Sequence, residues 1–132
     1  MYDTELALNI LSQIQEATLK ILNRFKPVRS ISDFTDTEAG MEKLDSICML
    51  LIAIGEALKN MDKVTQNSIL INYPQVDWKK AKGMRDIISH HYFEMDAAVI
   101  FDVCRIKIPE LSQTFQQIIC DLEHKEPSSQ LP

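Results

Sequence analysis

Apolar residues recur at helical spacing along most of the chain, and the breaks in this pattern predict four to five helices. The first helix is expected over residues 4–25, and it must end before Pro27 because the residue before a proline is disfavoured in the α region. A second long helix is predicted from about residue 37 to residue 61. Gly55 lies inside this helix, and a glycine at such a position often marks the close approach of another helix.

Three shorter helices follow in the pattern. Asp77 is a suitable cap for a helix over residues 78–90, and Asp96 is a suitable cap for a fourth helix. Pro109 fits the first turn of a fifth helix, because its missing N–H would have no partner there. The apolar residues of the fourth helix that are expected to face the core are Val99, Ile100, Val103 and Ile106.

These elements predict an all-α fold, an antiparallel bundle of four to five helices that occupies residues 1–124. Residues 125–132 are polar, contain serine and proline, and are expected to form a disordered tail. Of the 132 residues, 45% are hydrophobic and 25% are charged, which excludes a disordered chain or a fibrous repeat. Three glycines and five prolines are few, which favours long helices over many turns.

The composition of the chain also bears on where in the cell the protein is expected. The longest apolar run covers only residues 47–55, far short of the ~20 residues that span a bilayer. The first residues lack the pattern of a signal peptide, so we expect a cytoplasmic protein with no membrane partner. The three cysteines, which are expected to be buried free thiols, are Cys48, Cys104 and Cys120.

Charge is unevenly distributed along the chain. The net charge is -5, yet two segments free of acidic residues hold eight of the 14 lysines and arginines. One segment covers residues 20–29, and the other contains Lys79, Lys80, Lys82 and Arg85. An acidic body with two basic patches could hold a polyanion locally. The alternative is that both segments are ordinary solvated helix faces.

The segment from Arg85 to Tyr92 gathers a fixed cation, two histidines and a hydroxyl. Histidine can take and give a proton near neutral pH, and the planar arginine fork can stabilise charge on phosphate oxygens. A phosphodiester reaction needs both abilities. On a helix, however, Arg85 and His90 would point about 140° apart. They converge only if the helix ends between them or if a second chain supplies the partner.

Two simpler interpretations stay open from spacing alone. His90 or His91 could pack at a helix end while Arg85 pairs with an acid. A metal site is also conceivable, because Asp86 and His90 are i, i+4 neighbours on a helix and Glu94 or Asp96 follows.

The order Arg85, four residues, His90, one residue, Tyr92 matches the R-x4-H-x-Y signature of HEPN ribonucleases. The chain most resembles the HepT toxins of HepT–MntA toxin–antitoxin pairs, over about residues 5–122. The other features that it shares with them, in the same order, are Phe34, the stretch Ile54-Gly55-Glu56-Ala57, Pro74 followed by Trp78, and Gly83-Met84 before Arg85.

The resemblance implies a HEPN-like bundle and a metal-independent endoribonuclease that uses no cofactor and acts on RNA. In such enzymes the 2′-hydroxyl attacks the adjacent phosphate and leaves a cyclic phosphate end. Family members form homodimers in which the two motifs face each other across the two-fold axis. By resemblance, His90 performs acid/base work or holds the 2′-hydroxyl, and Arg85 stabilises phosphate charge.

The resemblance also implies a partner. Tyr92 resembles the tyrosine that an MntA-like nucleotidyltransferase antitoxin modifies with AMP, and on a helical turn it would share the face of Arg85. Asp86 stands where asparagine is common, and its charge could orient His90 or repel RNA. The residues that would contact the RNA backbone, on charge alone, are Lys79, Lys80 and Lys82.

Two other functions remain as alternatives. HEPN-like bundles also serve as non-catalytic partners or substrate-binding subunits of nucleotidyltransferases, and a plain helical interaction module is a third possibility. An intact set of Arg85, His90 and Tyr92 favours the enzyme, because a pure scaffold has no chemical need for all three.

Overall fold

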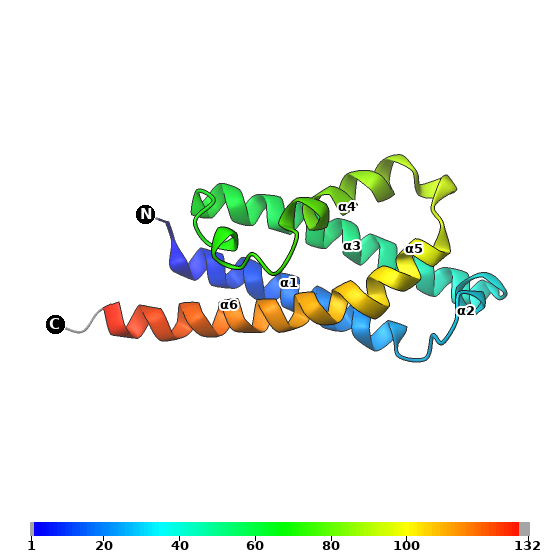
Figure 1. The fold of residues 1–132 in the computed structure, drawn as a ribbon, viewed down its shortest axis with the longest axis horizontal. Helices are drawn as coiled ribbons and strands as arrows, with labels where there is room; N and C mark the ends of the chain where they lie inside the picture. The colour runs from blue at the N-terminus through cyan, green and yellow to red at the C-terminus, as the bar shows by residue number, and fades with distance from the viewer. Residues whose placement is uncertain (1, 130–132) are drawn as a thin grey trace.

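A computed structural model describes residues 2–129, and this part of the chain is all-α and contains no strand (Figure 1). The α-helices are α1 (Thr4–Phe25), α2 (Ser32–Thr35), α3 (Glu38–Thr65), α4 (Trp78–His90), α5 (Ala97–Asp102) and α6 (Ile108–Ser129). Short 3-10 turns cover Leu70–Asn72 and Tyr92–Glu94, and a π-helical segment covers Val103–Lys107. The predicted all-α bundle is confirmed.

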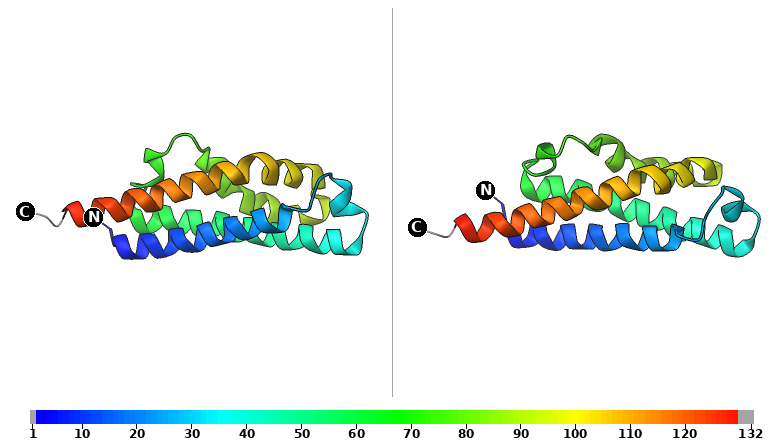
Figure 2. Two further views of the ribbon diagram at one scale, coloured as in Figure 1. Left: turned by 90° about the horizontal axis from the view of Figure 1, so that it is seen from below. Right: turned by 60° about the horizontal axis from the view of Figure 1, so that its bottom comes forward.

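The long helices run antiparallel along one axis. Successive long helices reverse direction, so α1 and α4 run one way while α3 and α6 run the other (Figure 1). Helix α1 packs against both α3 and α6, and α4 lies on α3 (Figure 2). No helix within residues 2–129 is both long enough and apolar enough to cross a membrane.

Side-chain caps explain where these helices begin. The carboxylates of Asp3, Asp77 and Asp96 each accept a hydrogen bond from a backbone N–H in the first turn of their helix, at 2.9–3.1 Å. Thr37 does the same for α3, where its hydroxyl accepts from Gly40 N at 3.0 Å. Each cap satisfies an N–H that would otherwise lack a partner at a helix start. The boundaries predicted from Asp77 and Asp96 are therefore confirmed.

Pro109 lies in the first turn of α6, as predicted, but no break separates this helix from the preceding one. Helix α5, the π segment and α6 follow one another without a gap, so the predicted fourth and fifth helices are continuous. The N–H of Ile108 bonds to the carbonyl of Val103, five residues back, which is the wider turn of a π-helix. Pro109 is then the second residue of α6.

This wider turn also changes which residues face inward. The inner residues Ile100, Cys104 and Ile108 are spaced by four, and an α-helix would rotate each about 40° away from the last. The π turn holds more residues and keeps all three on the core side. Val99 and Ile106, which were predicted to face the core, are instead about half exposed.

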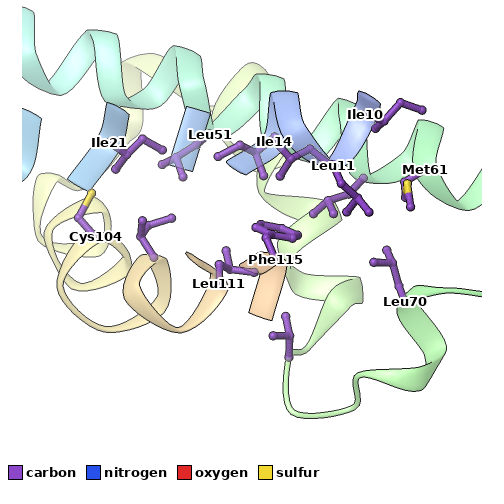
Figure 3. Close-up of a cluster of buried hydrophobic side chains, with 14 of the residues drawn as sticks. Ile10, Leu11, Ile14, Ile21, Leu51, Met61, Leu70, Cys104, Leu111 and Phe115 are labelled. Carbon is purple, nitrogen blue, oxygen red and sulfur yellow. The ribbon is translucent and has the colours of Figure 1, made fainter. Parts of the chain in front are cut away.

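The core lies between α1, α3 and the α5–α6 helix (Figure 3). Its labelled side chains in Figure 3 are Ile10, Leu11, Ile14, Ile21, Leu51, Met61, Leu70, Cys104, Leu111 and Phe115. Cys48 and Cys104 are buried as predicted, and burial raises their thiol pKa values to about 11 and about 12. Cys120 is exposed, because it lies on the outer side of α6 two residues from the buried Ile118, so its predicted burial is wrong.

The C-terminal segment that was predicted to be a tail is described only in part. Helix α6 reaches Ser129, beyond the position where the tail was predicted to begin. Residues 130–132 lie outside the described residues, as do the side chains of 125–129, so the disordered tail over 125–132 stays a prediction.

Candidate functional site

Gly55 sets the distance between α3 and α4. A Cβ at this position would lie 2.8 Å from Cβ of Arg85 and 3.2 Å from the carbonyl oxygen of Lys82. No other residue type fits there without displacing α4, which confirms the expectation that Gly55 marks the close approach of a helix. The same contact fixes Arg85 against α3.

Replacing Gly55 with alanine is expected to destabilise the protein by up to about 2 kcal/mol, because overpacking costs roughly 1–3 kcal/mol and the gain in helix propensity offsets only roughly 1 kcal/mol of it. Gly83→Ala is the matched control, because it lies in α4 with no atom within 4 Å of an added Cβ. The control variant should be stabilised by up to about 1 kcal/mol. Urea unfolding measures both variants, and equal stability of the two would contradict the close-packing account.

Arg85 lies between two carboxylates. Its Nε is 2.5 Å from Oε1 of Glu56 on α3, and its Nη1 is 2.8 Å from Oδ1 of Asp86. The other oxygen of Asp86 is 3.3 Å from Nζ of Lys59. The hydrogen bond from Arg85, with a second from Lys59, lowers the pKa of Asp86. The same bond, together with Glu56, raises the pKa of Arg85, so the four groups form a charged network of alternating sign.

His90 is the last residue of α4 and is exposed. The helix does not end between Arg85 and His90, so the two side chains leave α4 about 140° apart. Because α4 continues through both residues, Arg85 and His90 can converge only if a second chain supplies the partner. Among the described residues, Asp86 makes its hydrogen bonds to Arg85 and Lys59 and none to His90.

Tyr92 lies in the 3-10 turn after α4, and its hydroxyl donates a short hydrogen bond to Asp45 on α3. Arg85 contacts α3 at Glu56, eleven residues further along that helix, which corresponds to about 16 Å at 1.5 Å per residue. The expectation that Arg85 and Tyr92 share a face is wrong within one chain, because α4 ends before Tyr92.

The basic segment at the start of α4 is less positive than its sequence suggests. Lys82 pairs with Asp62 on α3, and both side chains are largely buried. Lys79 and Lys80 are exposed, and neither forms an ion pair within the described part of the chain. Two of the three predicted RNA contacts thus present free cations to solvent.

Apolar side chains surround the end of α4. Phe93 is 100% exposed and Tyr92 is 40% exposed, with their rings 5.7 Å apart. Ile87, one turn before His90, is half exposed, and so is Val99 at the start of α5. A fully exposed phenylalanine among other apolar side chains is typical of a surface that another molecule covers.

The structure also contains a cavity away from Arg85, His90 and Tyr92. It has a volume of about 270 Å³ between α4 and the helix formed by α5 and α6, with Leu51, Met84 and Leu111 in its walls. None of Arg85, His90 and Tyr92 lines it. Its walls are mostly apolar, with the charged residues Asp77, Lys80, Lys107 and Glu110 also in its lining, and no histidine is among its described lining residues, so it does not replace the motif as the candidate site.

The structure gives no support to the metal interpretation. Asp86 is engaged by two cations, and within residues 2–129 no three His, Cys, Asp or Glu side chains gather closely enough to bind a metal ion.

Sequence reasoning did not assign roles to Asp45 and Lys59, and it noted Glu56 only as part of a family-like stretch. These side chains contact residues 27 to 47 positions away in the sequence. The one signal that pointed to them was Gly55, because it predicted that another helix approaches this part of α3.

The fold is an all-α bundle of the HEPN type, as its helices and the R-x4-H-x-Y motif in α4 and the turn after it indicate. The family described as "Ribonuclease HepT-like" matches residues 7–118. The chain belongs to this family.

Curated relatives agree with this assignment. "Putative RNase MJ1216" of Methanocaldococcus jannaschii is 34% identical over 64% of this chain and 66% of its own length. "Putative RNase MJ0127" of the same organism is 32% identical over 77% of this chain and 86% of its own length. "Probable ribonuclease HepT" of Thermococcus cleftensis is 30% identical over 55% of this chain and 63% of its own length. No solved structure matches the chain with statistical significance.

Proposed function

We propose that this chain is the toxin of a HepT–MntA-type toxin–antitoxin pair, a metal-independent endoribonuclease whose cleft forms between two copies of the chain. The observation that carries the proposal is that α4 holds both Arg85 and His90, with His90 at its exposed end, two residues before the turn that contains the exposed Phe93. The names of the relatives, RNase and ribonuclease HepT, support the same activity.

A second copy would complete the site. One chain presents Arg85 and His90 on different faces of an unbroken helix. A two-fold axis near the end of α4 would place the same surface opposite itself, so that each residue occurs twice in one cleft. The exposed ring of Phe93 would then be covered by the partner copy.

The chemistry requires two proton transfers. As the 2′-oxygen bonds to phosphorus, its proton must leave, and as the bond to the 5′-oxygen breaks, that oxygen must gain a proton. The two His90 side chains of a dimer can provide one acceptor and one donor. Arg85 stabilises the charge that develops on the phosphate oxygens, and its five N–H donors leave some free beside Glu56 and Asp86.

The nature of the nucleophile tests this mechanism. The purified chain is incubated with an unmodified RNA and with the same sequence carrying 2′-O-methyl groups at every position. We expect internal cuts with cyclic phosphate ends in the first strand and none in the second, because the methyl group blocks the attacking oxygen. Equal cleavage of both strands would exclude attack by the 2′-hydroxyl.

Dimer formation is tested separately. Phe93→Asp should convert a symmetric dimer into a monomer at micromolar concentration, because it places a charge in the centre of the proposed interface. Ile71→Asp is the matched control, since Ile71 is 73% exposed in a different turn, and this variant should stay dimeric. Light scattering measures both. A wild-type monomer that cleaves RNA at full rate would contradict the composite site.

Neutralisation would come from AMP added to Tyr92 by an MntA-like nucleotidyltransferase. Tyr92 is exposed enough to be reached by another protein. The adduct would not meet Arg85 of its own chain, given the separation of their contacts along α3. It would instead add bulk and negative charge beside His90 and Phe93, which blocks RNA and crowds the proposed interface.

The alternative is a non-catalytic partner of a nucleotidyltransferase. The observation that favours it is the pairing of Arg85 with two carboxylates, since such ion pairs also occur at purely structural positions. This function requires no RNA cleavage, so the comparison of unmodified and methylated RNA distinguishes the two functions.

A further inference from the structure

We infer that Asp45 accepts the proton of the Tyr92 hydroxyl when that hydroxyl attacks a nucleoside triphosphate. This inference rests on the proposed AMP modification of Tyr92 and adds to it a catalytic residue supplied by the modified chain itself. The geometry that points to it is the direct hydrogen bond from the Tyr92 hydroxyl to Oδ1 of Asp45.

Asp45 is suited to this role by its surroundings. It lies on α3, exposed to solvent, while Tyr92 lies in the turn after α4. Asp62 and Asp86 both pair with lysine or arginine, whereas Asp45 forms no ion pair among the described residues. Its negative charge is therefore not offset by a neighbouring cation. The second carboxylate oxygen makes no hydrogen bond within the part of the chain that the structure describes.

There is also room for a reacting phosphate. A cavity of about 200 Å³ borders Asp45, Tyr92 and Phe93 and is open to solvent. A nucleotide held by the partner enzyme can approach the phenol from this side without any unfolding of the bundle.

The phenol is protonated at neutral pH. The hydrogen bond to Asp45, followed by burial and the charge of Asp45, raises the pKa of Tyr92 to about 12. The other titratable group that acts on Tyr92 is Cys48, which is buried, with its own pKa raised to about 11 by burial and then by Asp45. Glu94, in the same turn as Tyr92, faces His91 at 3.9 Å. Asp45 is thus the carboxylate in contact with the hydroxyl.

The balanced step follows from these contacts. The Tyr92 oxygen bonds to the α-phosphorus of ATP, and the bond from that phosphorus to the bridging oxygen of pyrophosphate breaks. Pyrophosphate leaves with the electron pair. The phenol proton passes to Oδ1 of Asp45 and from there to water, so a neutral, weakly nucleophilic phenol acquires its reactivity only as the new bond forms.

The experiment measures the initial rate of AMP transfer from Mg-ATP by an MntA-like nucleotidyltransferase, using intact mass and peptide mapping. Asp45→Asn keeps an oxygen that accepts from Tyr92 but cannot take a proton. We expect its rate to fall at least about 100-fold at pH 7, the lower end of the usual contribution of a general base. Asp121→Asn is the matched control, because Asp121 accepts a hydrogen bond from a different tyrosine, Tyr73, at 2.5 Å.

The pH profile separates proton transfer from mere positioning. Without Asp45, the reactive form is the phenolate, whose fraction rises tenfold per pH unit below the phenol pKa. The Asp45→Asn rate should therefore rise about tenfold per unit between pH 7 and pH 9, while the wild-type rate stays nearly flat. A spectrophotometric titration of the chain alone should also show the Tyr92 pKa falling from about 12 towards its ordinary value in this variant.

The experiment distinguishes a failure of the proposed Tyr92 modification from a failure of the role proposed for Asp45. No adduct on the wild-type chain would overturn the modification and this inference together. An adduct on Tyr92 that forms as fast or faster with Asp45→Asn would overturn only the inference and make Asp45 a restraint on the hydroxyl. If Asp45→Asn fails to fold, as judged by circular dichroism, Asp45→Ser is measured in the same way against the same outcomes.

Discussion

Replacing either Arg85 or His90 with alanine is expected to reduce RNA cleavage by about 10²–10⁴-fold, to the limit of detection in most assays. Loss of a general acid or base costs this much, and loss of a group that stabilises transition-state charge costs a similar amount. Both sites of the proposed dimer are affected at once, because each copy carries the same substitution. Initial rates on a labelled RNA measure the effect.

The chain offers a matched control for each variant. His91→Ala removes the neighbouring exposed histidine, and Arg105→Ala removes an exposed arginine that pairs with Asp102 at 3.1 Å. Both controls should cleave at the wild-type rate. Arg85→Ala leaves Glu56 and Asp86 with one cation fewer, and solvent-screened ion pairs of this kind contribute little to stability. A large loss of activity in either control, or full activity in His90→Ala, would contradict the assignment.

Tyr92→Phe is expected to escape neutralisation completely. Co-expression of an MntA-like nucleotidyltransferase should raise the mass of the wild-type chain by whole AMP units on the peptide that contains Tyr92, and it should abolish RNA cleavage. The phenylalanine variant has no oxygen to modify, so its mass and its cleavage rate should be unaffected by the partner. The variant loses only one exposed hydrogen bond, to Asp45, and should fold normally.

Tyr73→Phe is the control for this experiment. The hydroxyl of Tyr73 donates to Asp121, and the side chain is only partly exposed between the turn after Leu70 and α6. This variant should still be modified and neutralised. An adduct that maps to Tyr73 or Tyr2, or inhibition without any change in mass, would contradict the role of Tyr92.

The helices could be predicted from sequence because local signals define them. Asp77 and Asp96 predict the starts of α4 and α5, because their carboxylates accept hydrogen bonds from backbone N–H groups in the first turn of each helix. The π segment could not be predicted from sequence. A proline such as Pro109 is accepted equally well in the first turn of a new helix and directly after a π turn, so its presence does not distinguish the two. The consequence of the π segment, the exposure of Ile106, was missed for the same reason.

The site was predicted only in part. The motif identified Arg85, His90 and Tyr92, and the helical angle between the first two correctly indicated that one chain does not bring them together. The partners of these residues, Glu56 and Asp45, depend on how α4 and the following turn lie on α3. Spacing along the sequence carries no information on such contacts, apart from the close approach at Gly55.

We propose that Arg85 and His90 of this chain cleave RNA without a metal ion. The most direct measurement is the initial rate of cleavage of a single-stranded RNA in excess EDTA, with wild-type protein and His90→Ala side by side. We expect the same wild-type rate with and without EDTA, 2′,3′-cyclic phosphate ends, and no detectable cleavage by His90→Ala. Loss of wild-type cleavage in EDTA with recovery on adding one divalent cation, or undiminished cleavage by His90→Ala, would contradict it.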